Sequence, residues 1–197
     1  MKRQRKIGLQ KICFLAGTFL LTAACAILFF WQWNIRTSQK KAQDYIHTLR
    51  SLLPEVQNAA LEERRDNSMP RLSLDGKDFI GILEIPRYGS ALPVCADWGN
   101  SSKYPSCLSG SIYNRSIQIG ATSQTGQYDF YRELSVGDSV YFTDMEGNRY
   151  TLEISDLRYK KHADQAALQS RDAALTLFIK NIYAFEYLIV FCDVSHS

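Results

Sequence analysis

Histidine and cysteine are both scarce in this sequence. Its 197 residues include three histidines and five cysteines, and no group of them has the spacing of metal ligands. We therefore expect no bound metal and no cofactor. Three of the cysteines, Cys95, Cys107 and Cys192, follow the long apolar run near the N-terminus. An odd number excludes a complete disulfide framework, although Cys95 and Cys107 could pair.

Charge is absent from Ile12 to Trp33, a run of 22 residues. A helix of this length crosses the roughly 30 Å hydrocarbon core of a bilayer. Basic residues precede the run, namely Lys2, Arg3, Arg5, Lys6 and Lys11, and aromatic residues close it, namely Phe29, Phe30, Trp31 and Trp33. Because basic flanks favour the cytoplasmic side, the sequence predicts a cytoplasmic tail (1–11), a transmembrane anchor (12–33) and an extracellular remainder.

Two other interpretations of this run stay open. A signal peptide would end after about 7–15 apolar residues at a small-residue cleavage site. The segment Thr22-Ala23-Ala24-Cys25 could also be a lipoprotein site, with Cys25 lipidated. The apolar run continues past both points to Trp31, which favours the uncleaved anchor. Either anchor leaves the rest of the chain on the outer face of the membrane.

The excess of basic residues belongs to the N-terminus. The formal net charge is +3, but five of the 23 basic residues precede the apolar run, which leaves 18 against 20 acidic residues. A slightly acidic domain lacks the basic surface that nucleic acid requires. We therefore expect no nucleic-acid partner.

Residues 34–77 are predicted to form a helical stalk or linker. Their scattered apolar residues have a weak 3.6-residue period, consistent with a helix that is broken or started at Pro54. Residues 67–78 read as a loop because Asn, Ser, Pro and Gly are frequent there. A compact domain of residues 78–197 follows.

This domain has strand signals at short intervals, which predict a mainly β barrel or sandwich. The expected strands are 78–86, 91–94, 116–120, 139–143, 149–155, 174–180 and 186–191. A glycine-containing loop at 144–148 should join two of them as a hairpin. Short helices are expected at 128–134 and 164–174.

The order of the motifs resembles the sortases, membrane-anchored cysteine transpeptidases of Gram-positive bacteria. The motifs are GILEIP and LPV, then SGS, then LSVGDSVYFTDMEGNRYTLEI, then LTLF and a last apolar strand. The likeness is greatest to class B and D-like members, and it implies an eight-stranded sortase barrel at the cell wall. It also implies that strands 174–180 and 186–191 are parallel neighbours lining a groove. Their short connection leaves an antiparallel pair open, because parallel pairs normally need about 12 linking residues.

The resemblance also implies three catalytic groups that this sequence does not retain. The family cysteine closes a Thr-Leu-x-Thr-Cys motif, which here ends in Lys180. The family arginine position holds Tyr187, and the histidine position, about sixteen residues before Asp138, holds Thr122. There is no histidine between His47 and His162, no arginine after Arg171, and no cysteine after Cys107 except Cys192. Cys192 is expected to face away from the side of its strand that carries Tyr187.

We therefore predict a divergent, catalytically silent sortase homologue that binds a peptide sorting signal, a pilin or an active sortase. The residues expected to line its groove are Asp97, Trp98, Ser123, Thr176 and Phe178. The alternative is an enzyme with altered chemistry, in which Lys180 acts as base for the hydroxyl of Thr122 or Ser123. That dyad requires a buried Lys180, since a lysine near its free pKa of about 10.4 is charged. A purely structural domain is the third possibility, and His162 is expected to be a surface residue.

Overall fold

The computed structural model describes residues 2–61, 67–98, 103–122, 132–161, 173–181 and 186–194. The chain divides into two units, residues 1–37 and 38–197. The first unit belongs to helix α1 (Lys2–Leu52), which by length and composition could cross a membrane. The hydroxyl groups of Thr18 and Thr22 donate hydrogen bonds to backbone carbonyls one turn earlier in this helix. This pairing suits an apolar environment, where no water is available as a partner.

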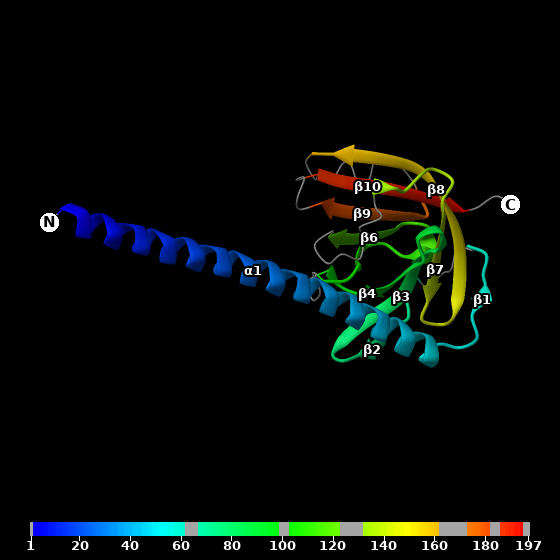
Figure 1. Cartoon of the computed structure of the whole chain (residues 1–197). Coiled ribbons are helices and arrows are strands. Elements are labelled where there is room, and N and C mark those ends of the chain that lie inside the picture. Colours follow the sequence, from blue (N-terminus) through cyan, green and yellow to red (C-terminus); the bar gives the residue numbers. More distant parts are fainter. Residues whose placement is uncertain are drawn as a thin grey trace. The chain divides into compact units, whose positions relative to one another are not determined.

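The second unit is an eight-stranded closed barrel, as the sequence predicted (Figure 1). Its strands are β3 (Lys77–Ile85), β4 (Ser90–Cys95), β5 (Ser106–Ser109), β6 (Ile117–Thr122), β7 (Ser139–Asp144), β8 (Asn148–Lys160), β9 (Leu175–Asn181) and β10 (Glu186–Val194). They pair in the order β8-β10-β9-β6-β5-β4-β3, and β7 closes the ring by pairing with both β3 and β8. Two short 3-10 helices, η1 (Pro86–Tyr88) and η3 (Ile112–Asn114), lie in the connections.

Apolar side chains at alternate positions along the strands fill the barrel interior. Leu175, Leu177 and Ile179 of β9 belong to one buried cluster with residues of alternating position on the neighbouring strands. Cys192 lies in this interior cluster, on the opposite side of β10 from Tyr187, as the strand period requires. A buried thiol in this position packs as a small apolar group.

The parallel pairing expected for the last two strands is wrong. Strands β9 and β10 are antiparallel, with Lys180 opposite Tyr187 and Leu177 opposite Val190. Four residues, 182–185, connect them, which is too short for the crossover that a parallel pair needs. The parallel neighbour of β9 is instead β6, from which it is separated in sequence by the whole β7–β8 hairpin.

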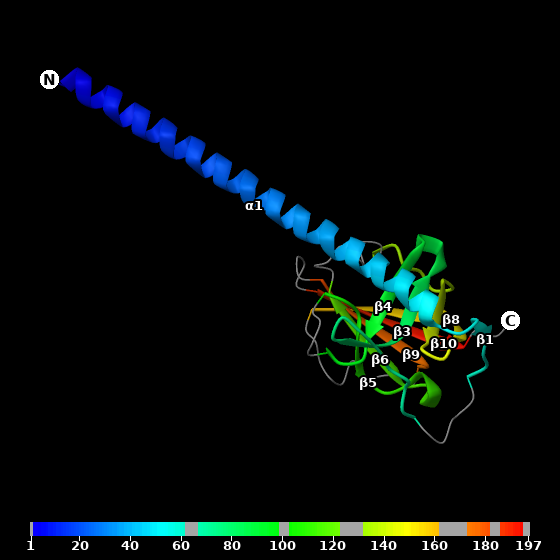
Figure 2. The ribbon, with the colours of Figure 1, turned by 90° about the horizontal axis from the view of Figure 1, so that it is seen from below.

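The last turns of α1 pack on the outside of the barrel wall (Figure 2). Ala42, Ile46 and Leu49 follow one helical stripe and are buried with Phe79 and Ile82 of β3. At the edge of this contact, Arg50 of α1 and Arg149 of β8 both donate to the Glu84 carboxylate. The helix ends at Leu52, before Pro54, whose ring disfavours helical backbone in the preceding residue.

Two short strands extend the sheet where the sequence predicted a linker and a loop. Strand β1 (Gln57–Asn58) pairs with β8, and β2 (Leu72–Leu74) pairs with β3. Asp75 and Gly76 turn the β2–β3 hairpin with φ angles of 50° and 70°. A two-residue Asp-Gly turn of this kind matches the twist of a hairpin. The two short helices expected at 128–134 and 164–174 lie almost entirely outside the described residues.

Cys95 and Cys107 do not form the disulfide that the sequence left open. Cys95 is buried in the cluster beneath α1, whereas Cys107 packs against the interior cluster. The two side chains therefore lie on opposite faces of the sheet, from which a disulfide cannot form without movement of the backbone.

Asp138 fixes the turn before β7 to the η1 segment. Its carboxylate is 8% exposed and accepts hydrogen bonds from Arg87 at 2.6 Å and from the backbone N–H of Ser135 at 2.9 Å. Burial raises the pKa of Asp138, but the hydrogen bonds and the positive charge of Arg87 outweigh it and hold the pKa below its usual value. The ionised carboxylate therefore stabilises the folded chain.

We expect the substitution Arg87→Ala to make the barrel more sensitive to acid. A lowered folded-state pKa gives stability that is complete above the unfolded value of about 3.9 and is lost as pH falls through the folded value. Without Arg87, the largest of the contributions that lower it is lost, the folded pKa of Asp138 rises, and the acid unfolding midpoint should move to higher pH. Circular dichroism against pH measures this midpoint. Arg71→Ala is the control, because Arg71 pairs with an exposed carboxylate, and an equal shift in both variants would contradict the prediction.

Candidate functional site

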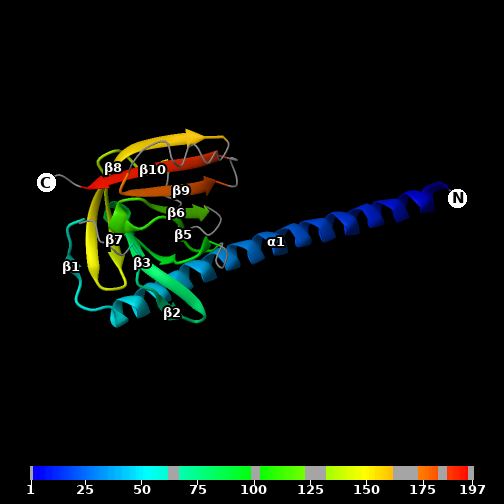
Figure 3. The same cartoon turned by 180° about the vertical axis from the view of Figure 1, so that it is seen from behind.

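The three positions at which the sequence resemblance implied catalytic groups lie directly opposite one another on adjacent strands. Thr122 of β6 is in register with Lys180 of β9, and Lys180 is in register with Tyr187 of β10. On the far side of β10, Tyr187 pairs with Lys160 of β8. Neighbouring strands are about 4.8 Å apart. These four residues form one line across the outer face of the barrel, which we call the Lys180 row. Figure 3 shows the strands that carry them, β6, β9, β10 and β8, side by side.

Aromatic contacts hold the centre of the Lys180 row. The Tyr187 ring stacks on Phe178, with ring centroids 5.0 Å apart and planes at 25°. The Lys180 Nζ lies 5.9 Å from the centroid of the Tyr187 ring, within the range of a cation–π interaction. Lys180 itself is exposed and Tyr187 is half-buried. The ammonium group is thus presented to solvent above an aromatic stack.

Trp98 packs against the line of residues next to the Lys180 row, which includes Gly120 of β6 and Phe178 of β9. Gly120 is in register with Phe178, and a methyl group on Gly120 would overlap the Trp98 ring and lie 2.8 Å from its Cη2. The indole therefore packs flat against the backbone of β6, where only the absence of a side chain leaves room. Trp98 remains 45% exposed. It extends the aromatic surface from Tyr187 and Phe178 toward β5.

On the outer face, side chains are more deeply buried farther from the Lys180 row. Phe178 and Ile189 are 9% and 1% exposed, and in the line beyond them Thr176 and Phe191 are 3% and 0% exposed. Thr176 is therefore on the predicted face but is not accessible to a ligand. Arg158 of β8 lies over the Phe191 ring at 5.0 Å.

The other residues expected near the groove divide into two groups. Asp97 is exposed and makes an ion pair with Arg71 at 3.4 Å, next to Trp98 in the chain. Ser123 and His162 lie outside the described residues. Sequence reasoning missed Lys160, because its place in the row depends on the pairing register of β8 with β10, which no local motif encodes.

The cysteines outside α1 are placed away from the Lys180 row. Cys192 faces the barrel interior and Cys95 faces α1. Burial raises the pKa of the Cys107 thiol and also that of Cys192, which keeps both protonated near neutral pH. Lys180, for its part, is exposed, so the burial that a hydroxyl–lysine dyad requires is missing.

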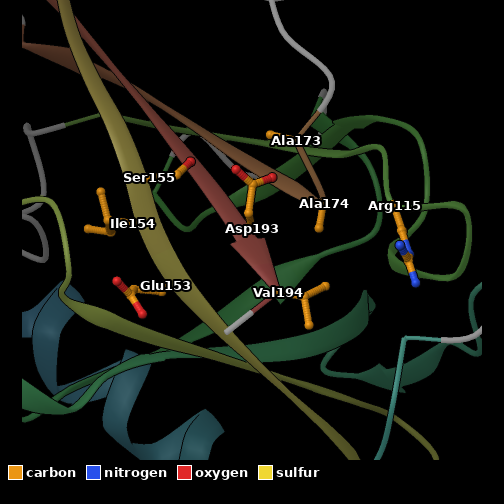
Figure 4. Close-up of a pocket in the computed structure, with 8 residues that line it drawn as sticks. All are labelled: Arg115, Glu153, Ile154, Ser155, Ala173, Ala174, Asp193 and Val194. Carbon is orange, nitrogen blue, oxygen red and sulfur yellow. The ribbon is translucent and has the colours of Figure 1, made fainter. Parts of the chain in front are cut away.

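A separate pocket of about 730 Å³ lies at the other end of strands β9 and β10 (Figure 4). The side chains that line it come from the middle of β8, the segment before β9, the end of β10 and the end of η3: Arg115, Glu153, Ile154, Ser155, Ala173, Ala174, Asp193 and Val194. Arg115 donates a hydrogen bond to the carbonyl of Leu61 at 2.6 Å, which occupies part of its guanidinium. No sequence motif links these positions, and sequence analysis named none of them.

Comparison with known proteins places the barrel among the sortases by structure. No family model matches the sequence, and no curated protein matches it. Sortase A from Corynebacterium diphtheriae matches with a TM-score of 0.52 and 16% identity over 83% of this chain and 85% of that chain. Sortase C1 from Streptococcus agalactiae matches with a TM-score of 0.52 and 18% identity over 64% of this chain and 72% of that chain.

A third structure contains a peptide. It is sortase C from Clostridium perfringens with the C-terminal cell wall sorting motif, which matches with a TM-score of 0.50 and 19% identity over 67% of this chain and 79% of that chain. At these identities the likeness establishes the fold. The chain therefore has the sortase fold, while its assignment to class B or D remains a prediction.

Proposed function

We propose that this chain is a catalytically silent sortase homologue that binds a peptide sorting signal, a pilin or an active sortase. The observation that carries the proposal is the Lys180 row. It brings Thr122, Lys180 and Tyr187 into line at the positions where the resemblance implies histidine, cysteine and arginine. The sortase face is thus retained as a surface, with a different set of side chains on it.

The chemistry of the row supports binding and not acyl transfer. A sortase nucleophile is a thiolate assisted by a base, whereas Lys180 is exposed and stands over the Tyr187 ring. Tyr187 is itself stacked on Phe178. Aromatic rings held in this way supply contact area at low conformational cost, which is why Trp and Tyr are frequent in the energetic centres of interfaces. Trp98 adds a further exposed ring.

The proposed setting is the outer face of a cell membrane of a Gram-positive bacterium. Residues 12–33 would form the anchor, 1–11 the cytoplasmic tail and 34–77 the stalk of the barrel domain 78–197. The apolar composition of α1 supports the anchor, and the basic residues before it support a cytoplasmic N-terminus. The packing of Ala42, Ile46 and Leu49 against β3 supports a stalk that is joined firmly to the barrel.

We expect the full-length chain in lipid nanodiscs to bind a synthetic peptide that carries a cell wall sorting motif. Trp98→Ala should weaken this binding about 30-fold or more, since truncating a tryptophan at the energetic centre of an interface costs about 2 kcal/mol or more. Calorimetry measures both affinities. Val136→Ala is the matched control, because Val136 is an exposed apolar residue in the turn before β7.

Two results would contradict the proposal. If neither the peptide nor a purified pilin or sortase binds the wild-type chain, the barrel is a structural domain. If binding occurs and Trp98→Ala and Val136→Ala have the same effect, the ligand binds at another surface.

A further inference from the structure

We infer that the Lys180 row recognises a carboxylate, so that the peptide bound by this chain carries an acidic group. The inference rests on the proposed function and specifies its ligand. Lys180 and Lys160 lie on either side of Tyr187 in the row, one on β9 and one on β8. Their backbones are therefore about 10 Å apart, at two strand spacings. Long lysine side chains at this separation can reach the same ligand group above the Tyr187 ring.

Both ammonium groups are available for a ligand. Lys180 and Lys160 are exposed, and neither forms an ion pair with another residue in the described part of the chain. Glu186, the acidic residue next to Tyr187, alternates to the other face of β10 and is in register with Asn181. The stacked Tyr187 ring restricts Lys180, so part of the entropy of ordering its side chain is already lost before binding.

Two of the segments that continue from the row contain no charged residue. They are residues 123–128, which follow Thr122 and precede Asp129, and residues 182–185, which join Asn181 to Glu186. Lys160 is followed by Lys161 and His162. The row itself holds two lysines and no acidic residue, although the barrel and stalk together are slightly acidic. This local contrast favours a ligand with negative charge at this point.

The extent of the charge favours a peptide carboxylate over a polyanion. In the next line of side chains, Phe178 and Ile189 are apolar, and Arg158 is neutralised by Asp156 at 2.8 Å. A polyanion would need positive charge along its whole track. A peptide needs one polar contact and an apolar surface for its other side chains, which Trp98 and Tyr187 provide.

The test uses the full-length chain in nanodiscs and paired synthetic peptides built on the cell wall sorting motif. One position at a time carries glutamate in one peptide and its neutral isostere glutamine in the other. At low salt we expect one position at which glutamate binds about five-fold more tightly, the size of a typical exposed ion pair. The preference should disappear in Lys180→Ala, weaken in Lys160→Ala, and fade in the wild type as salt screens the attraction.

Lys77→Ala is the matched control, because it removes the same charge from β3, four strands away from β9 in the ring. It should keep the preference for glutamate. Peptide binding with no preference, or a preference that survives in Lys180→Ala, would overturn the inference and leave the proposed function standing. Binding of inorganic polyphosphate in place of every glutamate peptide would also overturn it. Absence of all peptide binding would overturn the inference, and the proposed function would fall with it only if a purified pilin and a purified sortase also fail to bind.

Discussion

Replacing Asp144 with alanine should destabilise the folded barrel by about 3–5 kcal/mol, because several donors lose their acceptor together and each buried polar group left unsatisfied costs about 1–3 kcal/mol. Asp144 is 0% exposed at the end of β7. Its carboxylate accepts hydrogen bonds from the Tyr113 hydroxyl at 2.9 Å, from the backbone N–H groups of Glu146 and Asn148 at 2.9 Å, and from the Asn148 amide at 3.0 Å. Alanine would leave these donors without this acceptor, and the Tyr113 hydroxyl among them is buried.

This loss is a large fraction of the total free energy of unfolding, which is only about 5–15 kcal/mol for a domain. Denaturant unfolding of the full-length chain in detergent, followed by near-UV circular dichroism, measures it. Tyr113→Phe removes one hydrogen bond and should cost about 1 kcal/mol. Asp97→Ala removes an exposed carboxylate and should cost less. Equal midpoints for Asp144→Ala and Asp97→Ala would contradict the structural role of Asp144.

The Asp144 network also illustrates which features the sequence could predict. The alternation of residues 139–155 and the glycine of the 144–148 loop are local signals, and the β7–β8 hairpin that they predict is confirmed. The partner of Asp144 is not local, because Tyr113 comes from η3, 31 residues earlier in the chain. Its burial therefore depends on how the barrel closes, which a reading of hydrophobic periodicity does not contain.

The features that the sequence did not predict, namely strand β5, the β2–β3 hairpin and the place of Lys160, had weak local signals or depended on distant pairing. Strand β5 has only four residues, Ser106–Ser109, and two serines that hide its pattern. The β2–β3 hairpin had a signal, the Asp75-Gly76 pair, but the many polar residues around it favoured a loop. The Lys180 row contains residues of both kinds. The order of motifs pointed to Thr122, Lys180 and Tyr187, whereas Lys160 can be placed in the row only once the pairing register of β8 with β10 is known.

Incubation of the wild-type chain with a sorting-motif peptide should give no acyl adduct. Losing a complete nucleophile and base typically lowers kcat about 10⁶-fold. Cys95 and Cys192 are buried, and burial raises the pKa of the Cys107 thiol, so these cysteines do not replace the missing thiolate. Intact-mass spectrometry of the full-length chain after long incubation measures the adduct directly. An adduct on Cys95, Cys107 or Cys192 would overturn the prediction of a silent enzyme.

The triple substitution Thr122→His, Lys180→Cys and Tyr187→Arg tests whether the row still has the geometry of a catalytic site. It places imidazole, thiol and guanidinium side by side on β6, β9 and β10. Ala121 and Ile179, which precede Thr122 and Lys180 in the chain, are 4% and 1% exposed in the barrel interior, on the other face of their strands from the row. We therefore expect slow acylation of the introduced thiol. The unreactive control is the same triple variant with Lys180→Ser in place of Lys180→Cys. A triple variant that is folded by circular dichroism and remains free of adduct would show that the row has lost more than its reactive groups.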